Sequence, residues 1–158
     1  MNILVLCTGN SARSILLESL LNTRGKGRVT AFSAGSQPAG KVHPQSIALL
    51  NAEGHDVSAA RSKSWNEFAA PGAPEMDAVI TVCGSAAEET CPIWPGVPVR
   101  AHWGVEDPAA AAPEDQPAAL RDAYEILGRR ADAFLALDIE GLPRADLVAE
   151  LDRIGKIA

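Results

Sequence analysis

Apolar residues along the chain gather in short runs, separated by polar turns and by stretches with helical spacing. The run Asp77–Val82 is nearly all apolar and contains β-branched residues, as is typical of a strand buried on both faces of a parallel sheet. The apolar run Asn2–Leu6 and the weaker patterns over Val29–Ala34 and Val97–Trp103 predict three more strands. Four strands are therefore expected.

Between and after these strands, apolar residues recur with helical spacing, which indicates helices packed on a core. Pro44 and Pro143 suit the first turn of a helix, and Gly54 suits the position where a helix ends. The predicted helices are Ala12–Thr23, Pro44–Gly54, Leu120–Leu137 and Pro143–Ile154.

Alternation of strands with helices is the pattern of an α/β protein whose parallel sheet is covered on both faces. We therefore expect a three-layer sandwich with a four-stranded parallel sheet, formed by a single domain over residues 1–158. Cys7, Cys83 and Asp107 each follow a predicted strand. Because such sheets bind ligands at the carboxyl ends of their strands, these three residues are expected at one edge.

The balance of charge limits the classes of partner. A formal charge of -6 argues against a nucleic-acid-binding protein or one that binds an anionic membrane, since either needs a basic surface. No apolar run approaches the roughly 20 residues of a membrane span, and the first residues lack the basic lead and cleavage site of a signal peptide. We expect a cytoplasmic protein that acts on small molecules or other proteins.

The chain has three cysteines, too few for a disulfide scaffold and more typical of reactive or buried thiols in a reducing compartment. Cys7, Cys83 and Cys91 form no CxxC pair, and the three histidines lie outside HxxxH and HExxH spacings. The sequence therefore predicts no metal site.

The segment with the clearest chemistry is Cys7-Thr8-Gly9-Asn10-Ser11-Ala12-Arg13-Ser14, which lies between a predicted strand and a predicted helix. Several backbone N–H groups can converge there on one anion, Gly9 permits the turn, and Arg13 can hold two oxygens of a tetrahedral oxyanion. The helix and Arg13 both favour a Cys7 thiolate, and Ser14 can donate a hydrogen bond to the sulfur. A thiol with a pKa of about 8.5 is about 3% ionised at pH 7, against about 90% at a pKa of about 6.

The alternative is that Cys7 is a small buried residue at a strand end and Arg13 an exposed helix residue. The spacing of cysteine and arginine alone does not exclude it, because that spacing also occurs by chance. The strand before, the helix after, the glycine within and the serine following favour an anion-binding loop with a cysteine nucleophile.

With this loop the sequence resembles a superfamily, the low-molecular-weight protein tyrosine phosphatases and the arsenate reductases that share their fold. The resemblance implies a four-stranded parallel sheet flanked by helices, Cys7 as nucleophile and Asp107 as general acid. It extends in the family's order along most of the chain, through Ser33-Ala34-Gly35, His43-Pro44, Ser62-Lys63 and Asp107-Pro108.

The other two cysteines separate the two branches of this superfamily. Reduction of arsenate needs electrons from further thiols, whereas a phosphatase clears its intermediate with water. In thioredoxin-coupled arsenate reductases a pair similar to Cys83 and Cys91 relays the oxidation away from the nucleophile. The residues after Asp107-Pro108 are four alanines, where the phosphatases usually place aromatic residues against phosphotyrosine. We therefore expect an arsenate reductase.

In this interpretation Cys7 attacks arsenate, Cys83 attacks the Cys7 sulfur, and Cys91 then frees Cys7 by forming a disulfide with Cys83. No bound cofactor is expected, and the reductant is an external thiol protein, thioredoxin or a similar donor. A low-molecular-weight tyrosine phosphatase is the alternative enzyme. A non-catalytic anion-binding module is a third hypothesis, disfavoured because it needs neither Cys7 nor Asp107.

The resemblance also bears on a cation. Some arsenate reductases of this fold hold potassium with residues placed like Asn10, Glu18 and Ser33, together with an aspartate. Here Lys63 stands where that aspartate is expected, so its ammonium group is predicted to replace the metal ion. The alternative is that Asn10 only shapes the loop and Glu18 lies on a solvated face.

Overall fold

The computed structural model describes residues 1–84, 94, 96 and 98–158. Its centre is a parallel four-stranded sheet in the order β2-β1-β3-β4. The strands are β1 (Asn2–Leu6), β2 (Thr30–Ala34), β3 (Ala78–Thr81) and β4 (Val99–His102). This confirms the predicted α/β class and the four-stranded parallel sheet.

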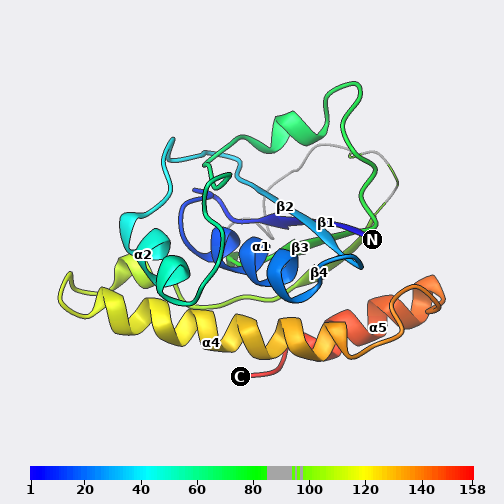
Figure 1. Cartoon of the computed structure of the whole chain (residues 1–158). Coiled ribbons are helices and arrows are strands. Elements are labelled where there is room, and N and C mark those ends of the chain that lie inside the picture. The colour runs from blue at the N-terminus through cyan, green and yellow to red at the C-terminus, as the bar shows by residue number, and fades with distance from the viewer. Residues whose placement is uncertain (85–93, 95, 97) are drawn as a thin grey trace.

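The sheet carries its helices in separate layers (Figure 1). Helices α1, α4 and α5 lie along one face, while the connection that contains the short helix η1 lies over the other. The bounds are α1 (Arg13–Arg24), α2 (Pro44–Ala52), η1 (Trp65–Phe68), η2 (Pro108–Ala110), α4 (Gln116–Leu135) and α5 (Arg144–Ile154). None of the described helices combines the length and apolar character needed to cross a bilayer.

Most predicted boundaries agree with the structure within two residues, and α4 is the exception. It begins at Gln116, four residues before the predicted start, because Pro117 occupies its first turn. The apolar pattern begins only at Leu120, so periodicity alone missed that turn. The two short helices η1 and η2 were not predicted, since neither is long enough to show a period.

The strand order determines which side chains meet at the carboxyl edge. β1 lies between β2 and β3, and the Val82 N–H donates to the Leu6 carbonyl at 2.9 Å, so the chain leaves both strands side by side. Cys7 directly follows β1 and Cys83 follows β3 by two residues. These two cysteines therefore lie beyond the ends of adjacent strands, at one edge of the sheet, as predicted.

Candidate active site

The loop between β1 and α1 presents a set of backbone donors. Within the described part of the chain, the N–H groups of residues 10–13 donate to no protein acceptor. Helix α1 also begins without a capping side chain at Ala12. Unpaired N–H groups at a helix start favour an anion, because they add to the positive end of the helix dipole. The loop thus has the donors that an oxyanion site requires.

The turn in this loop is made by Asn10 and not by Gly9, which corrects the prediction. Asn10 has a φ of 44°, in the left-handed region that asparagine tolerates, whereas Gly9 has no such backbone angle. The fully buried Asn10 side chain donates to Ser14 Oγ at 2.9 Å and accepts the Lys63 N–H at 2.9 Å. The contact of Ser14 is therefore with Asn10, and among the described contacts none joins its hydroxyl to Cys7.

Residues from the other short matches surround the loop and hold its carbonyls. The His43 N–H donates to Ser11 O at 3.0 Å, and Ser62 Oγ donates to Gly9 O at 3.2 Å. A Cβ added to Gly35 would lie 2.3 Å from the Thr8 carbonyl oxygen and 2.6 Å from that of Cys7. These contacts hold the loop carbonyls on one side of the loop, and the N–H groups are available to an anion on the other side.

Arg13 reaches from α1 to the loop after β4. Its Nη1 donates to Val105 O at 3.1 Å, and its Nη2 lies 3.7 Å from Asp107 Oδ2. The other Asp107 oxygen accepts the Ala109 N–H at 3.0 Å and caps η2. Arg13 is 14% exposed and Asp107 46% exposed, so the carboxyl group is open to solvent beside a partly buried guanidinium. The structure thus brings together Arg13 and Asp107, two of the residues that the sequence assigned to the site.

Cys7 and Cys83 are both buried free thiols joined by a hydrogen bond. Thr8 contributes a second link, since its N–H donates to Cys83 Sγ at 3.3 Å and its hydroxyl lies 3.6 Å from the same sulfur. Sequence reasoning did not foresee this role of Thr8, because nothing in the pattern relates residues 75 positions apart. Cys91, the third predicted thiol, lies outside the described residues.

The pKa of the Cys7 thiol differs from the prediction. It is raised above its ordinary value, chiefly by the hydrogen bond to Cys83 and then by burial, while Arg13 and the Gly9 N–H act in the opposite direction. The sequence showed the groups that stabilise a thiolate but not the neighbouring thiol. Ionisation of Cys7 in this arrangement therefore depends on how the two sulfurs share their protons.

The ammonium group of Lys63 is buried next to the loop between β1 and α1. Lys63 is 8% exposed, and its Nζ donates to Arg61 O at 3.0 Å and to Ser33 Oγ at 3.3 Å. It lies 3.8 Å from Glu18 Oε2, which also accepts the Ser33 hydroxyl. Burial raises the pKa of Glu18 and lowers that of Lys63, and each charge opposes the shift of the other. Lys63 takes the place predicted for a cation, so this arrangement does not fit a potassium ion.

The described residues contain no group of three histidine, cysteine or acidic side chains placed to hold a metal ion. The site is therefore built from sulfur, guanidinium, carboxyl and backbone N–H groups. This set can bind a tetrahedral oxyanion, attack it with sulfur and protonate a departing oxygen.

Comparison with known proteins agrees with this chemistry. Residues 2–145 match the family described as low molecular weight phosphotyrosine protein phosphatase. The chain is 34% identical over 131 residues to an arsenate reductase of Halalkalibacterium halodurans, covering 82% of this chain and 91% of the relative. It is 31% identical over 106 residues to a glutaredoxin arsenate reductase of Synechocystis, covering 67% and 77%. A solved structure described as an arsenate reductase in the phosphate binding state superposes with a TM-score of 0.69 at 26% identity, covering 85% of this chain and 96% of that one.

Proposed function

The chain belongs to the low molecular weight phosphotyrosine protein phosphatase family, and from this premise we propose that it is an arsenate reductase that converts arsenate to arsenite. One observation carries the proposal beyond the family. A second buried thiol, Cys83, follows the neighbouring strand, and its sulfur accepts the Thr8 N–H of the loop that carries Cys7. A hydrolase needs no such thiol, whereas a reductase needs one to supply electrons.

In the first step the Cys7 thiolate attacks arsenic, and one arsenic–oxygen bond breaks. Arg13 and the N–H groups of the loop hold the remaining oxygens, and Asp107 protonates the departing oxygen, which leaves as water. The product is a covalent Cys7–arsenic(V) adduct. Arsenic keeps its oxidation state at this stage.

In the second step the Cys83 thiolate attacks the Cys7 sulfur and forms a disulfide. The sulfur–arsenic bond breaks, and its electron pair passes to arsenic, which leaves as arsenite. The Cys91 thiolate then attacks Cys83, which frees the Cys7 thiolate and leaves a Cys83–Cys91 disulfide. An external dithiol reduces that disulfide, so each arsenate consumes one pair of thiol electrons.

The reductant in this proposal is a thiol protein in the cytoplasm, thioredoxin or glutaredoxin. The Synechocystis relative is named a glutaredoxin arsenate reductase, which supports a thiol donor in general. No bound cofactor is needed, since every electron enters through sulfur. The wall beside Asp107, formed by residues 108–112, contains no aromatic side chain, and this disfavours phosphotyrosine as substrate.

The first test is arsenate turnover with thioredoxin, thioredoxin reductase and NADPH, and in parallel with glutaredoxin and glutathione. Wild type is compared with Cys83→Ser and Cys91→Ser, and aryl-phosphate hydrolysis is measured in all three proteins. We expect arsenate turnover to fall at least about 100-fold in both variants, while hydrolysis, which needs only the loop and Asp107, changes little.

Trapping tests the order of the relay. Cys91→Ser mixed with one equivalent of arsenate should accumulate a Cys7–Cys83 disulfide, detected by mass spectrometry of peptides under non-reducing conditions. Efficient hydrolysis in all three proteins without arsenate turnover would instead identify a phosphatase in which Cys83 and Cys91 have no catalytic part.

A further inference from the structure

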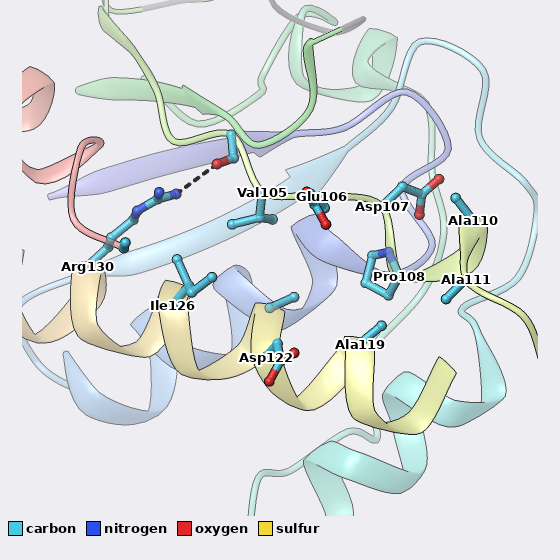
Figure 2. A pocket seen from close by; sticks show the side chains of 13 residues that line it. Val105, Glu106, Asp107, Pro108, Ala110, Ala111, Ala119, Asp122, Ile126 and Arg130 are labelled. Carbon is cyan, nitrogen blue, oxygen red and sulfur yellow. Dashed lines mark hydrogen bonds between the residues drawn. The ribbon is translucent and has the colours of Figure 1, made fainter. Parts of the chain in front are cut away.

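The loop that carries Asp107 lies beside a cavity. Residues 104–111 pass over a cavity of about 770 Å³, and the opposite wall is one face of α4 (Figure 2). The cavity is large because the facing positions are small: its lining includes Ala110, Ala111, Ala119 and Ala123. Pro108 is buried and Val105 packs against the core. The space between the loop and α4 nevertheless means that close packing alone does not fix the loop, so discrete polar contacts help to hold it.

Two side chains of α4 supply these contacts, one at each end of the loop. At the far end, Gln116 Nε2 donates to the carbonyls of Ala109 at 3.4 Å and Ala111 at 3.2 Å. At the near end, Arg130 Nη1 donates to Trp103 O at 2.8 Å and to a second carbonyl, that of Gly104, at 3.2 Å. The dashed line in Figure 2 marks the hydrogen bond from Arg130 to the Gly104 carbonyl, and the Arg130 side chain lines this end of the cavity.

Arg130 is an unusual residue for a core position. It is 6% exposed, and in the described part of the chain it forms no ion pair with a carboxylate. Its third hydrogen bond, from Nε to Ile157 O at 2.9 Å, is also to a carbonyl. A buried guanidinium without a counter-charge is costly to desolvate, which lowers its pKa, although it stays charged. The neutral residues leucine and methionine would fill the same space more cheaply.

The contacts of Arg130 lead directly to the site. Immediately after Gly104, the Val105 N–H donates to Val82 O at 3.2 Å, next to Cys83. The Val105 carbonyl accepts from Arg13, and two residues later Asp107 faces the same guanidinium. The start of this loop therefore determines where the carbonyl that orients Arg13 lies and where the carboxyl group lies.

We propose that Arg130 is a positioning residue of the reaction: by holding the Trp103 and Gly104 carbonyls, it places the loop that bears Asp107 against Arg13 and the oxyanion loop, residues 7–13 from the end of β1 to the first residue of α1. This inference rests on the proposed function for its catalytic consequence. Its structural consequence, the position of the loop, does not depend on the proposed function.

The test compares Arg130→Met with Arg129→Met. Arg129 is the neighbour of Arg130 on α4, is exposed, and donates from Nε to the main-chain oxygen of Ala158 at 2.9 Å. It therefore controls for the loss of a charge and of a contact with the last residues of the chain. Misplacement of the acid should lower kcat for arsenate about 10- to 100-fold in Arg130→Met, with a smaller change in KM because the loop amides still bind the anion. Arg129→Met should keep wild-type kcat.

A double-mutant cycle separates positioning from general weakening of the fold. In an Asp107→Asn background the acid is already absent, so adding Arg130→Met should cost several-fold less than it does in wild type, and the remaining loss reports the orientation of Arg13 by the Val105 carbonyl. An equal loss in both backgrounds overturns the proposal. Arg130→Lys serves if the methionine variant does not fold; it keeps the charge but loses the planar fork, and should give an intermediate loss and the same non-additivity.

A measurement without turnover keeps the two proposals apart. Amide hydrogen exchange by NMR should accelerate at least about tenfold at Val105 in Arg130→Met or Arg130→Lys, while β1 and β3 amides keep wild-type rates. Unchanged exchange at Val105 overturns the role of Arg130 whatever the activity. Wild-type protein that does not reduce arsenate, with the expected change at Val105, overturns the proposed function and leaves the positioning intact.

Discussion

Two sulfur atoms lie just beyond the ends of adjacent strands, in the candidate active site. Cys7 is placed by β1 and Cys83 by β3, and Thr8 bonds to the second sulfur from within the loop that carries the first. The hydrogen bond between the two thiols opposes the ionisation that Arg13 favours. In the proposed mechanism, Cys83, which accepts the oxidation, is therefore also the residue that restrains the Cys7 nucleophile.

This arrangement makes a prediction about Cys83→Ala. Because the hydrogen bond to Cys83 is the largest cause of the raised pKa of Cys7, its removal should lower that pKa and increase the thiolate fraction at any fixed pH. The pH dependence of Cys7 alkylation by iodoacetamide, resolved by mass spectrometry of the Cys7 peptide, measures it. The midpoint should move to lower pH in the variant, and a midpoint that stays or moves upward would contradict the assigned cause.

At this scale the sequence predicted which residues would meet but not how. Cys7, Arg13 and Asp107 could be placed at one edge because each has a fixed position after a strand or at a helix start. The sharing of protons between Cys7 and Cys83 could not be predicted, because it depends on the distance between two strands and on the direction of the side chains. Arg130 gave no signal either, since an arginine in an amphipathic helix normally lies on the solvated face.

At the scale of elements, the end of β2 packs against the first residues of the oxyanion loop. The Cβ missing from Gly35 would fall on the carbonyl oxygens of Thr8 and Cys7, at 2.3 and 2.6 Å. Both contacts are with backbone, which cannot rotate away as a flexible side chain can. The strand and the loop can therefore approach only through a residue without a side chain.

Gly35→Ala should accordingly destabilise the protein by about 1–3 kcal/mol and displace the loop, with a loss of arsenate turnover. Gly9→Ala is the matched variant for stability, because a Cβ there meets nothing within 4 Å and no left-handed backbone angle is required. Its free energy of unfolding should stay within about 0.5 kcal/mol of wild type. Urea unfolding of the three proteins measures both, and equal stability of the two variants would show that the loop yields to Gly35→Ala.

Elements of regular structure were largely predictable, and the connections between them were not. The strands and helices follow from apolar periodicity, which reports burial residue by residue. The segment from Gly54 to Asp77 has no such period, yet it delivers Ser62 and Lys63 to the loop. Its course depends on long-range contacts, which only the short resemblance at Ser62-Lys63 hinted at.

At the scale of the whole molecule, His55 joins three parts of the chain. It follows α2, its Nδ1 lies 2.9 Å from Thr23 Oγ1 and 3.1 Å from Ser19 Oγ in α1, and its Nε2 lies 2.7 Å from Tyr124 Oη in α4. Only 7% of the residue is exposed, and burial, followed by the charge of Arg24, lowers its pKa. The neutral imidazole thus belongs to the packing of the helices that cover the sheet.

Stability should consequently fall in mild acid. An unfolded histidine has a pKa near 6.5 and the folded one a lower value, so between the two values the unfolded state binds more protons. The contribution of His55 is complete above about pH 6.5 and is lost as pH falls toward the folded pKa, with a slope of at most about 1.4 kcal/mol per pH unit. Urea unfolding at pH 7.5, 6.5 and 5.5 should show a steeper fall for wild type than for His55→Gln. Identical slopes would assign the acid sensitivity to other groups.

The ammonium group of Lys63 has one more consequence. A free cation binds from the medium, so the fraction of molecules in which its site is filled depends on its concentration. A cation carried on the chain has a fixed effective concentration, and the entropy of bringing it there is lost once, when the protein folds. The oxyanion loop should therefore become ordered when the protein folds, and its order should not depend on the concentration of free cations in the medium.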